Sequence, residues 1–320
     1  MNRRDAVLAL LALSAAPAPV MAQQPGKMVR IGVLSSTSPD ARSAYGDAFK
    51  DGMATRGWRE GRDVTYVYRY TLGDSTKFNS LAIELVSEKP DLIFAPTQAA
   101  ALAVKRATHE IPIVFGFATD PVGSGLVTSL RRPGGNATGV SSLTTELSGK
   151  HIELLREIQP RLRRVAVLHL KVYEQDYHEA ERVARKMDVE LHSILVADQN
   201  ELGPAFESIA RMKPDAVLVI GFVIAMRQIV EGMAKLRVPA LYRIPEYVVA
   251  GGLMSYGASI AENYRLAASY ADRILKGAKP ADLPVEQPSM FELALNLKTA
   301  KALGIKVPQS ILLRATRVIE

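Results

Sequence analysis

The chain has 320 residues, with 40 lysines and arginines against 33 aspartates and glutamates, and it contains no cysteine. This length is enough for two domains of ordinary size. The lack of cysteine excludes disulfides, thiolate nucleophiles, cysteine metal ligands and a lipid anchor on a cysteine. The net charge of +7 is spread along the chain, so it indicates a solvated basic surface, or a field that attracts an acidic ligand, rather than a nucleic-acid interface.

Residues 1–22 are typical of a secretory signal peptide. Arg3 and Arg4 precede an apolar run at residues 6–16, and Val20-Met21-Ala22 fits a cleavage site. The apolar run is too short to remain as a membrane-spanning helix. The paired arginines leave twin-arginine export open as an alternative route. We therefore expect an exported protein that resides in the periplasm.

Strand and helix patterns alternate from Val29 to about Leu253. Short apolar runs have the length and composition of buried strands, and the segments between them place apolar residues at helical spacing. This alternation predicts an α/β fold with parallel sheets covered by helices on both faces. The predicted strands are 29–34, 64–70, 92–95, 111–115, 138–143, 164–170, 189–196, 216–220, 238–241 and 253–257. The predicted helices include 44–53, 81–86, 123–130, 150–158, 174–187, 201–212 and 261–276.

Two distant stretches repeat one pattern. Lys89-Pro90-Asp91 opens a strand, a helix and a second strand, and Lys213-Pro214-Asp215 opens the same series. Each copy is a βαβ unit, and two copies predict two similar lobes with a cleft between them. A cleft of this kind is a common place for a small ligand.

Three segments interrupt the alternation, and we interpret them as crossings of the chain between the two doubly wound parallel-sheet lobes. They lie near residues 143–149, 250–256 and 283–288. Lobe 1 then comprises residues 27–145 and 255–283, and lobe 2 comprises residues 146–254 and 284–320.

Candidate ligand-binding residues follow from the carboxyl ends of the strands, where parallel α/β sheets bind their ligands. Thr97 and Gln98 begin an alanine-rich helix, whose free N–H groups can hold a carboxylate. Alternatively, Thr97 is an N-cap that serves only the helix. Ser35 and Ser36 follow the first strand and have the same two interpretations. Asp120 can pair with a ligand ammonium, or it can form an Asx-turn into the next segment.

Aromatic residues near the predicted cleft can stack on a planar ligand, although each one alone is also typical of a protein core. The candidates are Phe117, Tyr173, Phe222, Tyr247 and Tyr256. The sequence contains no catalytic triad motif, phosphate-binding loop or dinucleotide fingerprint, and its five histidines lack metal-ligand spacing. We therefore expect a binding protein without cofactor or metal, not an enzyme.

Several long motifs resemble the ABC-transporter substrate-binding family, which includes tryptophan- and tyrosine-binding proteins. They are Asp120-Pro121-Val122-Gly123, the segment Arg132-Pro133-Gly134-Gly135-Asn136 with residues 137–140, Gly251-Gly252-Leu253-Met254-Ser255-Tyr256-Gly257 and residues 296–304. The resemblance covers essentially the whole mature chain. It implies the type I periplasmic-binding fold and delivery of a solute to a membrane permease that is driven by a cytoplasmic ATPase.

Two loops depart from the family pattern. Residues 169–173 replace an asparagine- and proline-rich loop, and residues 221–224 replace a polar or acidic one. Polar contacts from lobe 2 to an amino acid are therefore in question, and the ligand is either an amino acid or an aromatic or other organic acid.

These observations together predict a monomeric periplasmic component of an ABC importer that binds a small carboxylate-bearing molecule and no nucleic acid. An exported sensory subunit that presents its ligand to a membrane receptor kinase is the alternative, and an exported enzyme is a more remote one. The resemblance to an importer family favours the first.

Overall fold

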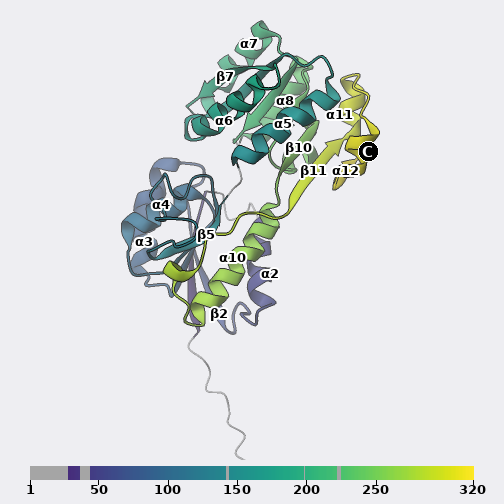
Figure 1. Cartoon of the computed structure of the whole chain (residues 1–320). Helices are drawn as coiled ribbons and strands as arrows, with labels where there is room; N and C mark the ends of the chain where they lie inside the picture. The colour runs from purple at the N-terminus through teal and green to yellow at the C-terminus, as the bar shows by residue number, and fades with distance from the viewer. Residues whose placement is uncertain (1–27, 37–43, 142–143, 198, 222–224) are drawn as a thin grey trace, which may run out of the picture.

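The computed structural model describes residues 28–36, 44–141, 144–197, 199–221 and 225–320. The expected signal peptide at residues 1–22 and the candidate ligand residue Phe222 lie outside the described residues. The described chain forms two α/β lobes, each built on its own sheet (Figure 1). The α/β class with two parallel-sheet lobes, predicted from the sequence, is confirmed.

Lobe 1 contains a five-stranded parallel sheet in the order β2-β1-β3-β4-β5. Helices α3 and α4 cover one face with buried apolar residues, and α2 and α10 cover the other. A sheet covered on both faces needs continuous apolar strands, and every residue of β3 is buried. The strands are β1 (Val29–Ser35), β2 (Val64–Tyr70), β3 (Leu92–Ala95), β4 (Ile113–Ala118) and β5 (Ala137–Ser141). The helices are α2 (Ala44–Ala54), α3 (Phe78–Ser87), α4 (Gln98–Ala107) and α10 (Ile260–Leu275), with short 3₁₀ turns η2 (Ser75–Lys77) and η5 (Pro280–Asp282).

Lobe 2 contains a seven-stranded sheet in the order β12-β11-β10-β9-β8-β6-β7, in which β10 and β11 are antiparallel. Helices α5, α6, α11 and α12 cover one face, and α7, α8 and α9 cover the other. The strands are β6 (Arg164–Leu170), β7 (Glu190–Val196), β8 (Ala216–Ile220), β9 (Ala240–Tyr242), β10 (Met254–Ala258), β11 (Phe291–Asn296) and β12 (Arg317–Ile319). The helices are α5 (Thr144–Ile158), α6 (Glu174–Arg185), α7 (Leu202–Met212), α8 (Met226–Leu236), α9 (Glu246–Val249), α11 (Leu297–Ala302) and α12 (Gln309–Arg314), with η3 (Lys171–Tyr173) and η4 (Gln199–Glu201).

The repeated sequence pattern produces the same hydrogen bonds in both lobes. In lobe 1, Asp91 Oδ2 accepts the backbone N–H of Arg30 at 2.8 Å, and the N–H of Asp91 donates back to the Arg30 carbonyl at 2.8 Å. In lobe 2, Asp215 Oδ2 accepts the N–H of Arg164 at 2.8 Å, and the N–H of Asp215 donates to the Arg164 carbonyl at 2.9 Å. Each aspartate therefore aligns the first strand of its lobe with the strand that follows the repeat motif.

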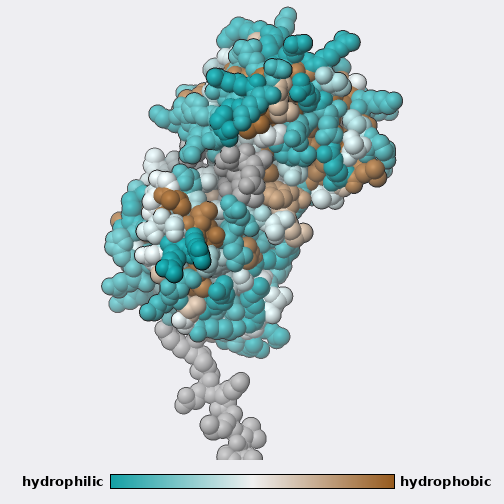
Figure 2. Space-filling model, viewed as in Figure 1, coloured by the Kyte–Doolittle hydropathy of each residue, from teal (hydrophilic) through white to brown (hydrophobic). Residues whose placement is uncertain are grey.

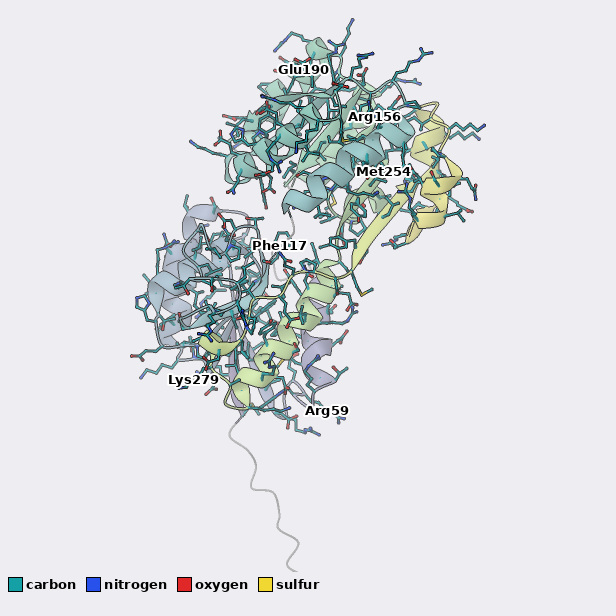
Figure 3. The ribbon with its side chains drawn as sticks, viewed as in Figure 1. Arg59, Phe117, Arg156, Glu190, Met254 and Lys279 are labelled. Atoms are coloured by element: carbon teal, nitrogen blue, oxygen red, sulfur yellow. The ribbon has the colours of Figure 1, made fainter. Side chains whose placement is uncertain are left out.

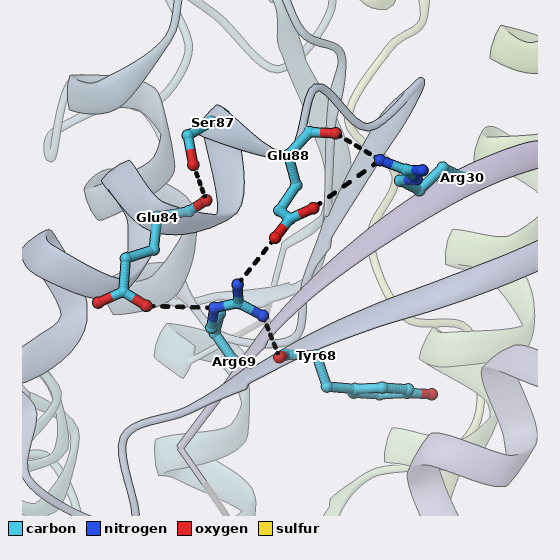
Figure 4. Close-up of polar contacts among 6 residues, drawn as sticks. All are labelled: Arg30, Tyr68, Arg69, Glu84, Ser87 and Glu88. Atoms are coloured by element: carbon cyan, nitrogen blue, oxygen red, sulfur yellow. Dashed lines mark hydrogen bonds and ion pairs between the residues drawn. The ribbon is translucent and has the colours of Figure 1, made fainter.

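A network of charged side chains surrounds this contact in lobe 1 (Figure 4). The guanidinium of Arg30 donates to the Glu88 carbonyl at 2.8 Å, and the Glu88 carboxylate also pairs with Arg69. Arg69 in turn contacts Glu84 at 3.2 Å. These side chains are partly exposed, so each ion pair contributes at most about 1 kcal/mol to stability.

The chain passes between the lobes three times, and the second boundary lies later than expected. The sequence pattern predicts that residues 255–283 belong to lobe 1, with a crossing at residues 250–256. The structure instead places β10 in the lobe 2 sheet, paired with β9 and β11. This pairing could not be read from the chain because a strand at a crossing is equally apolar in either lobe. The other two boundaries were also misplaced. The first falls between the end of β5 at Ser141 and the start of α5 at Thr144, and the third falls at residues 286–291, because Val285 packs in the core of lobe 1. The second crossing lies at residues 258–260.

The helix predicted at residues 123–130 is absent, and turns occupy this segment. Gly125 adopts a left-handed conformation with φ of 73°. The ammonium of Lys105 donates to the carbonyls of Gly125 and Leu126 at 2.8 and 2.7 Å. These carbonyls are consequently bonded to a side chain of α4 rather than to a helix of their own. None of the helices in the described residues combines the length and apolar composition that a membrane span requires.

Candidate ligand-binding cleft

A cavity of about 190 Å³ lies between the two lobes and takes its walls from both. Figure 3 shows Phe117 at the end of lobe 1 that faces lobe 2. In the view of Figure 2 the outer surfaces of both lobes are mainly hydrophilic. The residues that line the cavity are Gln98, Thr119, Asp120, Gly123 and Ser124 from lobe 1, and Gln175 and Asp176 from lobe 2.

Thr97 caps helix α4, and Gln98 is the first residue of that helix. The Thr97 backbone is extended, and its hydroxyl oxygen accepts the N–H of Ala100 at 3.4 Å. The N-cap interpretation of Thr97 is therefore confirmed. An N-cap bonds to only some of the free backbone N–H groups of the first turn. The amino end of α4 therefore still presents the positive end of the helix dipole beside the cavity.

Gln98 fixes the turn that carries Asp120. The backbone N–H of Asp120, at 2.8 Å, and the hydroxyl of Thr119, at 3.2 Å, both approach one atom of the Gln98 amide. A backbone N–H can only donate, so this atom is the oxygen Oε1. The NH₂ group of Gln98 consequently remains as a donor at the cavity wall.

Asp120 forms the Asx-turn that the sequence suggested, and it also lines the cavity. Its Oδ1 accepts the N–H of Gly123 at 2.7 Å, and its carbonyl accepts the hydroxyl of Ser124. The turn holds one carboxylate oxygen in place. The two interpretations of Asp120 are thus compatible, because a fixed carboxylate can still receive a ligand cation through its second oxygen.

Lobe 2 contributes a buried ion pair that sequence reasoning missed. Asp176 lies in the first turn of α6, and Arg243 directly follows β9. Arg243 Nη1 and Asp176 Oδ2 are 2.5 Å apart, and the side chains are only 14% and 8% exposed. A carboxylate is buried at this level only with a charged partner. Each residue follows a different strand of the same sheet. The sequence could therefore have indicated only that both residues lie at the carboxyl edge of the lobe 2 sheet.

His151 of α5 lies beside this ion pair and joins two segments near the crossings. Its Nε2 is 2.8 Å from the carbonyl oxygen of Tyr256 in β10. Burial, with a smaller contribution from Arg243, lowers the pKa of His151 to about 4. The ring is therefore neutral at neutral pH, and Nε2 donates its proton to the Tyr256 carbonyl.

The candidate aromatic residues fall into two groups. Tyr247 is only 2% exposed, stacks on Tyr242 at 4.4 Å, and donates its hydroxyl to the Gly221 carbonyl at 2.7 Å. It belongs to the core of lobe 2 and does not reach the cavity. Phe117 and Tyr173 are half-buried. Burial raises the pKa of the Tyr173 hydroxyl, and the charges of Arg243 and Asp176 act on it as well, which places this ring near the ion pair.

The remaining candidates lie outside the described cavity wall. Tyr256 is half-buried and stacks on Phe291 with ring centroids 6.0 Å apart. The carbonyls of Ser35 and Ser36, at the end of β1, accept the N–H groups of Thr71 and Gly73 at 2.9 Å. The role of Ser35, Ser36 and Tyr256 as ligand contacts therefore stays a prediction.

A larger hollow of about 400 Å³ opens at the amino ends of the lobe 2 strands, away from the cleft. Two of its charged side chains are already used by the fold. The carboxylate of Asp215 accepts the N–H groups of Arg163 and Arg164, and Arg237 donates to the Ala302 carbonyl. The smaller cavity, in contrast, takes polar groups from both lobes. Among the described residues no group of acidic and histidine side chains forms a metal site.

Two lobes with a polar cavity between them define a solute-binding protein of the periplasmic-binding class. The sequence profile of the ABC transporter substrate binding protein family matches residues 30–319, and the chain belongs to this family. The resemblance inferred from the motifs is confirmed. This family is a class of solute-binding proteins rather than enzymes.

Individual relatives are similar over nearly the whole chain. A tyrosine-binding protein from Clostridioides difficile (strain R20291) is 26% identical over 289 residues, covering 88% of this chain and 82% of that protein. The crystal structure of an ABC domain from Streptococcus pneumoniae in complex with L-Trp is 27% identical and has a TM-score of 0.85. A conserved domain protein from Vibrio cholerae is 28% identical, also with a TM-score of 0.85. Both structures cover 91% of this chain and are themselves covered completely.

Proposed function

We propose that the protein is the periplasmic solute-binding subunit of an ABC importer and that its ligand is an α-amino acid with an aromatic side chain. The arrangement of Gln98 and Asp120 at the interlobe cavity carries the proposal. Asp120 supplies a fixed carboxylate for the ligand ammonium. The amino end of α4 and the NH₂ group of Gln98 supply donors for the ligand carboxylate.

The charge of the cavity wall favours an amino acid over a plain carboxylic acid. Among the described residues that line the cavity, the charged side chains are Asp120 and Asp176, and neither lysine nor arginine is present. An anion without a compensating cation would face this negative wall, whereas a zwitterion brings its own ammonium. Lobe 2 can still provide a polar contact to an amino acid through Asp176, which lies outside the two loops, residues 169–173 and 221–224, that differ from the family pattern.

Relatives support the aromatic side chain. The similar protein from Clostridioides difficile is a tyrosine-binding protein, and the similar structure from Streptococcus pneumoniae contains L-Trp. Phe117 lies at the end of lobe 1 that faces lobe 2, and Tyr173 follows β6 near the Asp176–Arg243 pair of lobe 2. Both aromatic residues are partly exposed and are suited to pack on a planar ring. Membership of the family supports the importer role, in which a monomeric receptor carries the solute to a membrane permease. The signal-peptide pattern of residues 1–22 supports a periplasmic location.

Calorimetry with purified mature protein tests the ligand class. L-Tyrosine, L-tryptophan and L-phenylalanine are compared with aromatic acids that lack the amino group, such as 3-(4-hydroxyphenyl)propanoate. We expect binding of at least one aromatic amino acid, and tighter than that of its des-amino analogue. At 100 times the dissociation constant, the ligand should add about 2.7 kcal/mol to the free energy of unfolding. Failure of every amino acid to bind, with binding of a plain acid, would contradict the proposal.

A further inference from the structure

Asp176 has the features of a ligand acceptor that is built into lobe 2. Its side chain is 8% exposed, and it still lines the interlobe cavity. Arg243 holds the oxygen Oδ2, while no described residue donates to Oδ1. The ion pair fixes the direction of the carboxylate and supplies the charge that permits its burial. One oxygen is therefore positioned by the fold and the other is left for a donor in the cavity.

Asp120 has the same arrangement in lobe 1. The N–H of Gly123 holds Oδ1 at 2.7 Å, and the carboxylate lines the same cavity. The two aspartates thus approach one cavity from opposite lobes, with Gln98 and Gln175 beside them. An ammonium group has three N–H donors and no acceptor, so it can bond to two carboxylates and one further oxygen at once.

Two facing carboxylates also affect the empty protein. Like charges that share a site repel each other, and here the two charges belong to different lobes. Arg243 is engaged with Asp176 and is not among the residues that line the cavity. Arg243 offsets the charge of Asp176 and so weakens this repulsion, and an ammonium between the two carboxylates adds an attraction to both lobes that the empty cavity lacks.

We infer that the ligand ammonium is held jointly by Asp120 and Asp176, and that this bridge closes the lobes. The inference rests on the proposed function, because it assigns a role to the amino group of the proposed ligand. It separates two properties of the protein. The carboxylate of a ligand determines attachment to the amino end of α4 in lobe 1, and the ammonium determines closure.

The first experiment uses the unmodified sequence and needs no variant. Solution scattering gives the radius of gyration of the mature protein with L-tyrosine and with 3-(4-hydroxyphenyl)propanoate, each at a concentration that calorimetry shows to be saturating. We expect a smaller radius with tyrosine and the ligand-free radius with the des-amino acid. Equal compaction by both ligands would overturn the inference and leave the proposed function standing. Absence of amino-acid binding in the calorimetry would instead overturn the proposed function, and the inference with it.

The second experiment tests Asp176 itself. Asp176→Asn keeps an oxygen for Arg243 but removes the negative charge, and we expect about 10- to 100-fold weaker tyrosine binding, the range of one charged hydrogen bond. Affinity for the des-amino acid should stay unchanged or increase, and this binding also shows that the variant is folded. Glu174→Gln is the matched control, because Glu174 lies exposed in the same turn of α6. Equal loss of affinity for both ligands would assign Asp176 a structural role only and overturn the inference.

Discussion

The side-chain oxygen of Gln98 accepts the backbone N–H of Asp120 at 2.8 Å, which connects the first residue of α4 to the turn that carries the carboxylate. The donors at the start of α4 and the acceptor on Asp120 are thereby held in a fixed relation. A ligand with an ammonium and a carboxylate on neighbouring atoms presents the complementary pair. The spacing between the charges of the ligand is therefore as important as the charges themselves.

Asp120→Asn separates the two ligand classes. The amide oxygen of asparagine can still accept the N–H of Gly123, so the turn should persist while the negative charge is removed. We expect binding of an amino acid to weaken by about 1.5–3 kcal/mol, the value of a charged hydrogen bond. Binding of a plain carboxylic acid should be unchanged or stronger, because a like charge is lost. Calorimetry provides the measurement, with Asp51→Asn on the exposed surface of α2 as control.

Thr97→Val tests the start of α4. Valine lacks the hydroxyl that accepts the Ala100 N–H, so the free energy of unfolding should fall by about 1 kcal/mol. Thr97→Ser retains the cap and should restore most of that stability. If the ligand carboxylate lies at this helix end, Thr97→Val should also weaken binding. Unchanged affinity in both Thr97→Val and Asp120→Asn would rule out the proposed site.

His151 should make the protein less stable in mild acid. Its pKa is about 4 in the folded protein and 6.5 in the unfolded chain, so below pH 6.5 the unfolded chain binds a proton that the folded protein does not. The neutral His151 ring therefore contributes fully to the free energy of unfolding above pH 6.5, and this contribution is lost as the pH falls towards 4. Between pH 7.5 and 5 we expect about 2 kcal/mol of the pH dependence to come from this residue.

Urea unfolding at the two pH values measures that difference. His151→Gln keeps a donor for the Tyr256 carbonyl but does not titrate, so its stability should depend less on pH by about the stated amount. His109→Gln, at an exposed position, should behave like the unmodified protein. An identical pH dependence in all three proteins would show that His151 does not contribute.

Gly257 is required by the close approach of β10 to Arg243. A Cβ at residue 257 would lie 1.9 Å from the Arg243 carbonyl oxygen, a backbone atom that cannot rotate away. Gly257→Ala should therefore lower the free energy of unfolding by about 1–3 kcal/mol or more and weaken ligand binding. Gly149→Ala in α5 is the matched control, since its Cβ would meet only Val183 Cγ1 at 3.4 Å, an ordinary contact, and it should stabilise the protein by about 0.4–1 kcal/mol. Thermal and denaturant unfolding distinguish the two.

The two lobes could be predicted from sequence because the pattern that indicates them depends on neighbouring residues. In each copy of the Lys-Pro-Asp motif the lysine, Lys89 or Lys213, adopts a left-handed conformation with φ of 49°. The aspartate two residues later then bonds to the first strand of its lobe. Thr97 was likewise predictable, because an N-cap depends on its nearest neighbours alone.

The Asp176–Arg243 pair was not predictable in this way. The partners are 67 residues apart, and they meet because the sheet order places β8 alone between β6 and β9. Strand order depends on packing of the whole lobe, which periodicity does not reveal. The burial of Tyr247 has the same origin, since a tyrosine in the short helix that follows a strand can turn into the core or towards the cleft with one sequence pattern.

Helix α10 imposes an order of synthesis on the protein. It packs against α2 and supplies Tyr264, Ala267, Tyr270 and Ile274 to the core of lobe 1, yet it is translated after strands β6 to β10 of lobe 2. The face of the lobe 1 sheet that α2 and α10 share therefore stays only partly covered until most of the chain has left the ribosome, so we expect lobe 1 to complete its fold late. If residues 1–22 act as the export signal that their pattern predicts, this delay favours the extended form of the amino-terminal half that a narrow secretion channel accepts.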